Sequence, residues 1–247
     1  MQQDWQDFNL AFIQRRYDRL AAILPIFDRL FFLPVTFRRN AVSGLALKPG
    51  DRVLEIGCGT GLNLPHLRAA VGDTGHVYGV DLSGGSLAKA RELCAREGWN
   101  NVKLTQDDAA AYRAPELLDG VIFGLSYNTM PHRKTVLQHA LTQLRPSGYL
   151  VIQEAKPPTG LAGRLVMPFS VWIMRRTVLG NPYVRGWEDL AAVTDDFELR
   201  EFPRTTYFYC RGRKRRDDAP HVSARRRADT AGRLAEHASN REALPVD

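Results

Sequence analysis

The chain has 247 residues, of which 44% are hydrophobic and 25% charged, and its formal net charge is +7. A chain of this length and composition can bury the core of one domain built around a single sheet. Residues 211–247 hold ten basic and six acidic side chains, a net +4, which leaves only +3 for residues 1–210. The charge therefore gives little support for nucleic-acid binding by the folded part.

The cysteines and histidines predict neither disulfides nor a metal site. Cys58, Cys94 and Cys210 are an odd number without paired or ligand-like spacing, which favours a reducing compartment. The six histidines show no metal-ligand spacing. The N-terminus is acidic where a secretory signal would be basic, and the longest uncharged apolar run, Leu165–Met174, is about half of a bilayer-spanning helix. We expect a cytoplasmic protein without a bound metal.

The first 40 residues predict a helical cap ahead of the main domain. Residues Phe8–Phe37 place apolar side chains at helical spacing, and Pro25 and Pro34 interrupt this pattern. We expect two or three short amphipathic helices here.

Residues 41–210 predict an α/β domain with a mostly parallel sheet of seven strands and helices on both faces. Short apolar runs rich in Val and Ile alternate with helical patterns, which is typical of parallel strands joined by right-handed crossovers. Two late strands would close the sheet after a helical insertion over 157–190, and residues 211–247 predict a basic, largely disordered tail. The expected strands are Arg52–Ile56, His76–Val80, Val102–Leu104, Gly120–Phe123, Tyr149–Ile152, Phe197–Phe202 and Thr205–Cys210.

A glycine-rich loop follows the first of these strands. Residues Val53–Asn63 read VLEIGCGTGLN, so the loop ends a strand and opens a helix, where glycines let a ligand approach the backbone. Asp81 stands at the end of the second strand, and an acidic side chain there can accept hydrogen bonds from both hydroxyls of a ribose. Dinucleotide-binding enzymes use GxGxxG, whereas Leu62 replaces the last glycine here. The pattern predicts a ribonucleoside site.

Together with Glu55, this loop resembles the ExGxGxG motif of class I S-adenosylmethionine-dependent methyltransferases. The resemblance covers roughly Tyr17 to Cys210. Gln106–Ala109 is similar to the family's GDA segment, whose acidic residue reaches adenine. Leu144–Gly148 is similar to the family's LKPGG turn, with Ser147 in place of a glycine. It implies a Rossmann-like fold and S-adenosylmethionine as the cofactor. A nicotinamide oxidoreductase and a purely structural strand-turn-helix are the alternatives. The residues implied to bind the cofactor are Tyr17, Glu55, Gly57, Cys58, Gly59, Thr60, Gly61, Asn63, Asp81, Leu82, Asp107, Asp108, Ala109, Gly124 and Leu125, with Asp108 preferred to Asp107 for adenine.

The methyl acceptor is less well defined by the sequence. Arg16–Ala21 and Phe27–Asp28 are similar to the YDxxA…YD opening of ubiquinone C-methyltransferases and bacterial phospholipid N-methyltransferases, in which Tyr17 would help close over the cofactor. Gly59–Pro65 looks closer to the phosphatidylethanolamine and diacylglyceryl-homoserine N-methyltransferases. The resemblance favours N-methylation of a lipid headgroup or related amine. The alternatives are C- or O-methylation of an isoprenoid quinone or other small apolar acceptor, and a cofactor-binding regulatory protein without catalysis.

Candidate catalytic residues lie at the ends of the fourth and fifth strands. Gly124–Asn128 departs from the GxSxG elbow of serine hydrolases at its last position and lacks the DPPY-type motif of nucleic-acid amino-methyltransferases. We expect Ser126 and Tyr127 to lie near the acceptor, with packing of Tyr127 at the strand end as the alternative. Glu154 would hold an ammonium group or pass its proton to water, unless it is a solvated strand-end charge. Tyr17 completes the catalytic candidates.

Two apolar segments outside the strand-helix alternation, Phe8–Phe37 and Pro157–Leu190, predict a lid over the acceptor side. Large apolar residues flanked by cations suit an interfacial helix on an anionic membrane surface. We therefore expect a small-molecule or lipid acceptor and peripheral attachment at the inner face of the membrane. The alternative is that both segments pack on the sheet around a small soluble substrate. The flanking cations are Arg38, Arg39, Arg175 and Arg176.

Overall fold

The computed structural model describes residues 9–21, 33–156, 165, 168–169, 172, 180–203 and 205–215. The chain divides into two units, Met1–Lys214 and Arg215–Asp247, and all the elements below belong to the first. No helix among the described residues is both long and apolar enough to cross a membrane. The expectations for residues 22–32, for most of the insertion 157–190 and for the tail after 215 fall outside the described residues.

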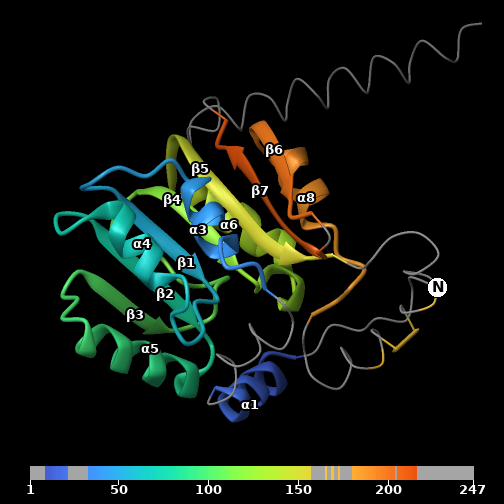
Figure 1. Cartoon of the computed structure of the whole chain (residues 1–247), viewed down its shortest axis with the longest axis horizontal. Coiled ribbons are helices and arrows are strands. Elements are labelled where there is room, and N and C mark those ends of the chain that lie inside the picture. Colours follow the sequence, from blue (N-terminus) through green and yellow to red (C-terminus); the bar gives the residue numbers. More distant parts are fainter. Residues whose placement is uncertain are drawn as a thin grey trace, which may run out of the picture. The chain divides into compact units, whose positions relative to one another are not determined.

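The strands of the described chain are β1 (Arg52–Ile56), β2 (His76–Asp81), β3 (Val102–Gln106), β4 (Leu118–Gly124), β5 (Leu144–Ala155), β6 (Asp195–Glu201) and β7 (Tyr207–Arg213). They form one sheet in the order β3-β2-β1-β4-β5-β7-β6 (Figure 1). Strands β1 to β5 pair in parallel, and β7 lies antiparallel between β5 and β6. The predicted mostly parallel α/β sheet is confirmed. The strand order reverses between β1 and β4, which is where such sheets open a crevice at the carboxyl ends of their strands.

Helices cover both faces of the sheet (Figure 1). One face packs against α3 (Phe37–Ser43), α4 (Leu64–Val71) and α5 (Gly84–Arg96), and the other packs against α6 (Arg133–Gln143) and α8 (Gly186–Val193). Because both faces are covered, the central strand β4 is buried almost throughout, as expected for a near-continuous apolar run in a parallel sheet. The two cores hold the sheet rigid beneath its carboxyl edge.

The N-terminal segment contains the helix α1 (Leu10–Leu20), which lies beside α5 (Figure 1). Asn9 caps this helix, because its side-chain oxygen accepts a hydrogen bond from the Phe12 amide at 2.8 Å. The predicted helical region Phe8–Phe37 therefore begins as a helix, and its last residue starts α3.

Two strand ends differ from the sequence-based expectation. Leu144–Gly148, predicted as a turn, belongs to β5, where the pairing with β4 shifts register between Leu118 and Gly120. Ser147 adopts a φ of 65°, which is the left-handed conformation that glycine takes most easily. At the other end, β7 continues to Arg213, beyond the expected boundary at Cys210.

Candidate active site

The candidate site lies where the carboxyl ends of β1, β2, β4 and β5 meet. In the loop after β1, Gly57, Gly59 and Gly61 all adopt positive φ angles. A side chain added at Gly59 would meet no atom within 4 Å, so the space over this backbone is open. An open, glycine-lined surface at the start of α4 fits the methionine part of S-adenosylmethionine.

Asp81, at the end of β2, organises the same loop. Its two carboxylate oxygens each accept one backbone amide, from Gly59 at 2.8 Å and from Ser83 at 2.8 Å. Burial raises the pKa of Asp81, and these two amides act in the opposite direction. A carboxylate has about four lone-pair sites. Asp81 therefore keeps acceptor capacity for ribose hydroxyls, as the sequence predicts.

Glu55 is a buried carboxylate under the loop, with 2% of its surface exposed. One oxygen accepts a hydrogen bond from the Asn63 amide at 2.7 Å, and the other has no hydrogen-bond partner among the described residues. Burial raises the pKa of Glu55 to about 8, although Asn63 and the positive charge of Arg38 act against this shift. An unpartnered buried carboxylate oxygen suits a cation, and the methionine end of S-adenosylmethionine carries an ammonium group. The residues present thus fit the cofactor.

The end of β3, predicted to reach adenine, pairs with β2 through Asp81 and Gln106. Asp107 lies next to Asp81, since its amide donates to the Asp81 carbonyl at 3.2 Å. Asp108 is half-buried and accepts the Ala110 amide at 3.0 Å, so its position is fixed. The side-chain amide of Gln106 also donates a hydrogen bond to the Leu82 carbonyl at 3.0 Å. The segment with Ala109 is therefore close to the ribose carboxylate.

Several predicted cofactor residues have side chains that are buried beneath the glycine loop. Cys58 is buried, and burial raises the pKa of its thiol well above the ordinary value, so it is no nucleophile. Thr60 is also buried. The side chain of Asn63 is fully buried and hydrogen-bonds with Arg38, Glu55 and Gln153; its predicted contact with the cofactor stays a prediction. Leu125, with a φ of 56°, turns the chain after Gly124 and donates its amide to the Gln153 carbonyl at 3.0 Å.

Glu154, predicted to lie on the acceptor side, stands at the end of β5. Only 4% of its surface is exposed, so it is not a solvated strand-end charge. Its oxygens accept the amides of Asn128 at 3.2 Å and Ala155 at 3.4 Å, while burial raises its pKa to about 8. A buried carboxylate with a raised pKa is a candidate for proton transfer.

Tyr17, on α1, lies between the two ends of the site. Burial raises the pKa of its hydroxyl, and the negative charges of Asp81 and Glu154 raise it further, whereas a hydrogen bond with Thr129 acts against the shift. Thr129 belongs to the short 3-10 helix η1 (Tyr127–Thr129) after β4. The charges of Asp81, from β2, and Glu154, from β5, thus both act on the Tyr17 hydroxyl of α1.

Tyr127 packs at the strand end, which is the alternative given for it above, and Ser126 is buried against Gly57 of the glycine loop. Tyr127 is fully buried, packs edge-on against Phe123 at 5.2 Å between ring centroids, and donates its hydroxyl to Asp189 at 3.1 Å. Ser126 donates its hydroxyl to the Ile56 carbonyl at 2.6 Å. Both side chains are used to join strands and helices, so they are structural.

Three polar residues at this site, Asp18, Arg38 and Gln153, were not predicted as site residues from the sequence. Asp18 accepts hydrogen bonds at the start of α5, from the Ser83 hydroxyl at 2.7 Å and from the Gly85 amide at 3.0 Å. Arg38 donates to Asn63 at 3.1 Å, and Gln153 is fully buried beside Asn63. Asp18 does adjoin Tyr17 in the YD motif, which is the one signal that could have found it.

The comparisons with known proteins agree with this geometry. A methyltransferase-domain family model matches residues 53–148. The demethylmenaquinone methyltransferase of Anoxybacillus flavithermus is 27% identical over 193 residues, which cover 77% of this chain and 78% of that protein. An S-adenosylmethionine-dependent O-methyltransferase from Thermotoga maritima (15% identity, TM-score 0.52, covering 72% of this chain and 64% of that chain) has the same fold. So does the N-methyltransferase NodS from Bradyrhizobium japonicum (17% identity, TM-score 0.52, covering 74% of this chain and 98% of that chain). The chain is therefore an S-adenosylmethionine-dependent methyltransferase of class I.

Proposed function

We propose that this enzyme transfers the methyl group to a ring carbon of an isoprenoid quinol or a similar apolar phenolic acceptor. The observation that carries the proposal is the buried carboxylate of Glu154 at the end of β5, whose negative charge, like that of Asp81, acts on the Tyr17 hydroxyl. Relatives named demethylmenaquinone methyltransferase, 25% to 30% identical, support a quinone-type acceptor.

The chemistry asks the protein for one proton acceptor and for alignment. S-adenosylmethionine, when bound, supplies a methyl group attached to a positively charged sulfur. When the methyl group is transferred, the sulfur becomes part of a neutral thioether. The carboxylate of Glu154 accepts the proton of the acceptor's hydroxyl, which places negative charge on the neighbouring ring carbon, so that this carbon forms the new bond to methyl. The ring then loses its proton to water. Holding the two reactants in line can supply roughly 7–11 kcal/mol of the barrier reduction.

N-methylation of a lipid amine such as phosphatidylethanolamine is the second candidate. The run Gly59–Pro65, which resembles the phospholipid N-methyltransferases, favours it, and the Glu154 carboxylate suits an ammonium headgroup as well as a phenol. The two candidates use the same carboxylate, so they differ only in the acceptor.

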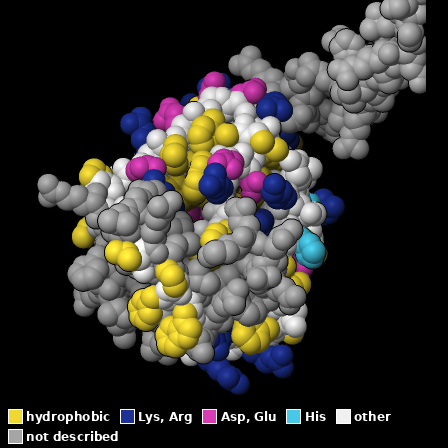
Figure 2. All heavy atoms as spheres, turned by 90° about the vertical axis from the view of Figure 1, so that its right-hand side faces the viewer, with side chains coloured by type: hydrophobic (Ala, Val, Ile, Leu, Met, Phe, Trp, Pro, Cys, Tyr) yellow, Lys and Arg dark blue, Asp and Glu magenta, His cyan; other side chains and the backbone are white. Residues whose placement is uncertain are grey.

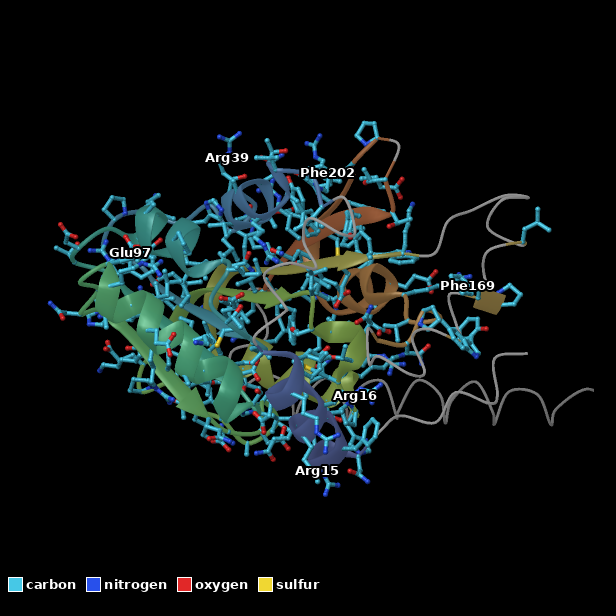
Figure 3. All side chains as sticks on the ribbon, turned by 60° about the horizontal axis from the view of Figure 1, so that its bottom comes forward. Arg15, Arg16, Arg39, Glu97, Phe169 and Phe202 are labelled. Carbon is cyan, nitrogen blue, oxygen red and sulfur yellow. The ribbon has the colours of Figure 1, made fainter. Side chains whose placement is uncertain are left out.

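An acceptor screen with labelled S-adenosylmethionine separates these candidates. We expect label in a demethylated quinol, no label in phosphatidylethanolamine, and a loss on the order of 100-fold in the Glu154→Gln variant, the size of general-base catalysis. Glu97→Gln is the control, because Glu97 is an exposed glutamate at the edge of the fold (Figure 3). Among the ion pairs of the described residues it pairs only with Arg96.

Three results would contradict the quinol proposal. Label in phosphatidylethanolamine alone would establish the lipid amine instead. Label in neither acceptor, with intact cofactor binding, would remove both candidates. Full activity of a folded Glu154→Gln protein on the quinol would show that Glu154 is not the base.

We also propose that the enzyme reaches its acceptor at an anionic membrane surface. Leu165, Phe169 and Trp172 are 75%, 61% and 51% exposed, and the rings of Phe169 and Trp172 stack at 5.9 Å. Hydrophobic side chains reach the surface on the side shown in Figure 2, and Phe169 extends away from the sheet in Figure 3. Exposed aromatic side chains of this kind insert at the headgroup level of a bilayer.

Vesicle flotation tests the membrane proposal. The Phe169→Ser, Trp172→Ser double variant should bind anionic vesicles less at low salt, where the electrostatic attraction is largest, and should bind S-adenosylmethionine normally. Leu117→Ser is the control, because Leu117 is 54% exposed on a loop before β4. Absence of vesicle binding by the wild-type protein would refute the proposal.

A further inference from the structure

We propose that Arg38, acting through Asn63, is a positioning residue for Glu55, and that this arrangement is what lets the enzyme recognise the amino-acid end of its cofactor. The proposal rests on the assignment of Glu55 to the cofactor's ammonium group. It goes further because it gives a function to the side chains of Arg38 and Asn63.

The three side chains form one chain of hydrogen bonds, part-buried at Arg38 and buried at Asn63 and Glu55. Arg38 donates to the side-chain oxygen of Asn63 at 3.1 Å, and the Asn63 amide nitrogen donates to Glu55 at 2.7 Å. The same nitrogen lies 3.4 Å from the side-chain oxygen of Gln153. Both the oxygen and the nitrogen of the Asn63 side chain are therefore hydrogen-bonded. Because the oxygen accepts from Arg38, the nitrogen is the atom that must face the Glu55 carboxylate.

The sheet is shaped to admit this amide. Gly124 of β4 lies between β1, which carries Glu55, and β5, which carries Gln153. A side-chain carbon at Gly124 would lie 2.6 Å from both the Asn63 nitrogen and the bonded Glu55 oxygen. The space that the glycine leaves is therefore filled by the Asn63–Glu55 hydrogen bond, and the carboxylate cannot rotate without breaking it.

The consequence is a carboxylate with one occupied and one available oxygen. The second Glu55 oxygen is buried and has no partner among the described residues, so it is oriented but unsatisfied. A group left in this state favours a ligand that brings its own donors and a positive charge. The α-ammonium group of the cofactor has both.

The charges around Glu55 make Arg38 the relevant cation. The groups that act on Glu55 are Arg38 from α3 and Asp81 from β2, and Glu55 in turn acts on the Cys58 thiol of the loop. Burial lowers the pKa of His66 on α4, and the positive charges of Arg38 and Arg39 lower it further. Arg38 thus supplies the positive charge that opposes both Asp81 and burial at this carboxylate.

A pair of cofactor fragments tests the inference directly. S-adenosylhomocysteine and 5′-methylthioadenosine are both neutral-sulfur nucleosides, and only the first carries an amino-acid end. We expect Arg38→Gln to weaken calorimetric binding of S-adenosylhomocysteine about tenfold, the effect of one hydrogen bond to a charged group, and to leave 5′-methylthioadenosine unchanged. Arg38→Lys, which keeps the charge and a donor, should recover most of the affinity.

Arg39→Gln is the matched control, because Arg39 is the next residue of α3 and points away from the fold (Figure 3). It should leave both affinities unchanged. Equal weakening of the two ligands by Arg38→Gln would show a merely structural role and overturn the proposal. Glu55→Gln separates the two assumptions. If this variant does not weaken S-adenosylhomocysteine more than 5′-methylthioadenosine, the assignment of Glu55 to the ammonium group is wrong. If Glu55→Gln weakens S-adenosylhomocysteine selectively but Arg38→Gln weakens both ligands equally, only the role of Arg38 is refuted.

Discussion

Two buried carboxylates, Glu55 and Glu154, give the site its chemistry. A fully buried carboxylate is costly unless a ligand or a hydrogen-bond network compensates it. Each of these is bonded by fixed donors, and burial raises the pKa of both to about 8. Their positions at the two ends of the site match a cofactor cation on one side and an acceptor proton on the other.

At the residue scale, Gly59→Ala should abolish or strongly weaken cofactor binding while the fold persists. Gly59 has a φ of 53° and open space around it, so the added methyl group strains the backbone by about 1 kcal/mol and occupies the cofactor's place. Gly98→Ala is a matched control, because Gly98 has a φ of 68° and equally open surroundings. Chemical unfolding should show similar losses for both variants, and equal cofactor affinities would contradict the loop assignment.

Tyr127→Phe tests the structural role given to that residue. The change removes a hydrogen bond to the Asp189 carboxylate and should lower the free energy of unfolding by about 1–3 kcal/mol, because the bond is to a charged group. The methyltransferase rate at 25 °C should remain close to that of the wild type. A large loss of rate in a folded Tyr127→Phe protein would return Tyr127 to the catalytic set.

The sequence marks the glycine loop and Asp81 more directly than it marks the acceptor side, for a physical reason. The glycine loop and Asp81 are local patterns in which backbone conformation and ligand chemistry coincide. Tyr127 stands at a strand end in the sequence, yet which way its ring points depends on the packing of α6 and α8. Arg38 and Gln153 meet Asn63 only through tertiary structure, so no local pattern marks them.

At the element scale, α1 is attached to the cofactor side by Asp18. Its carboxylate bonds the Ser83 hydroxyl and the Gly85 amide at the start of α5, and Ser83 also donates its amide to Asp81. Asp18→Ala should therefore free α1 and raise the dissociation rate of the cofactor about fivefold, as expected for the loss of roughly 1 kcal/mol. Stopped-flow displacement measures this rate.

The control for Asp18 is Arg15→Ala, since Arg15 is exposed on the outer side of α1 (Figure 3). Asp18→Asn keeps an acceptor oxygen and should restore part of the slow dissociation. An unchanged rate in Asp18→Ala would mean that α1 does not act on the bound cofactor.

The strand positions were predicted closely where apolar runs are uninterrupted, and less well at their ends. Residues Arg52–Ile56 match β1. Leu144–Gly148 was expected to be a turn because of its proline and glycine, but Leu144 still pairs with Leu118 before the register shift. The end of β7 was missed because Arg211 and Arg213 look like tail residues, whereas the sheet pairs them with Glu198 and Asp195.

At the scale of the whole molecule, the fold should require residues through Lys214 and none after it. Lys214 is buried and donates to the Leu144 carbonyl at 2.6 Å. A chain ending after Arg215 should unfold at the same urea concentration as the full chain, whereas one ending after Cys210 loses three residues of β7 and should be strongly destabilised. Equal stability of the two truncated chains would contradict the boundary.

The pH dependence of stability follows from the same two carboxylates. Burial raises the pKa of Glu55 and Glu154 from 4.5 to about 8, so the folded state binds protons more tightly than the unfolded state. Stability of the cofactor-free protein should therefore fall as pH rises from about 5 to about 8. Urea unfolding should show this slope, and the Glu55→Gln, Glu154→Gln double variant should flatten it. A rise in stability over this pH range would be inconsistent with two buried carboxylates whose pKa values are raised.

Calorimetric titration with S-adenosylmethionine, for the wild type and for Asp81→Ala, tests the central claim most directly. The wild type should bind it and S-adenosylhomocysteine in the micromolar range and should bind nicotinamide dinucleotides far more weakly. Asp81→Ala should lose about 1.5–3 kcal/mol of binding free energy, because it removes the carboxylate that accepts the ribose hydroxyls. Unchanged affinity in a folded Asp81→Ala protein, or tight binding of a nicotinamide dinucleotide, would show that the site assigned to the cofactor is wrong.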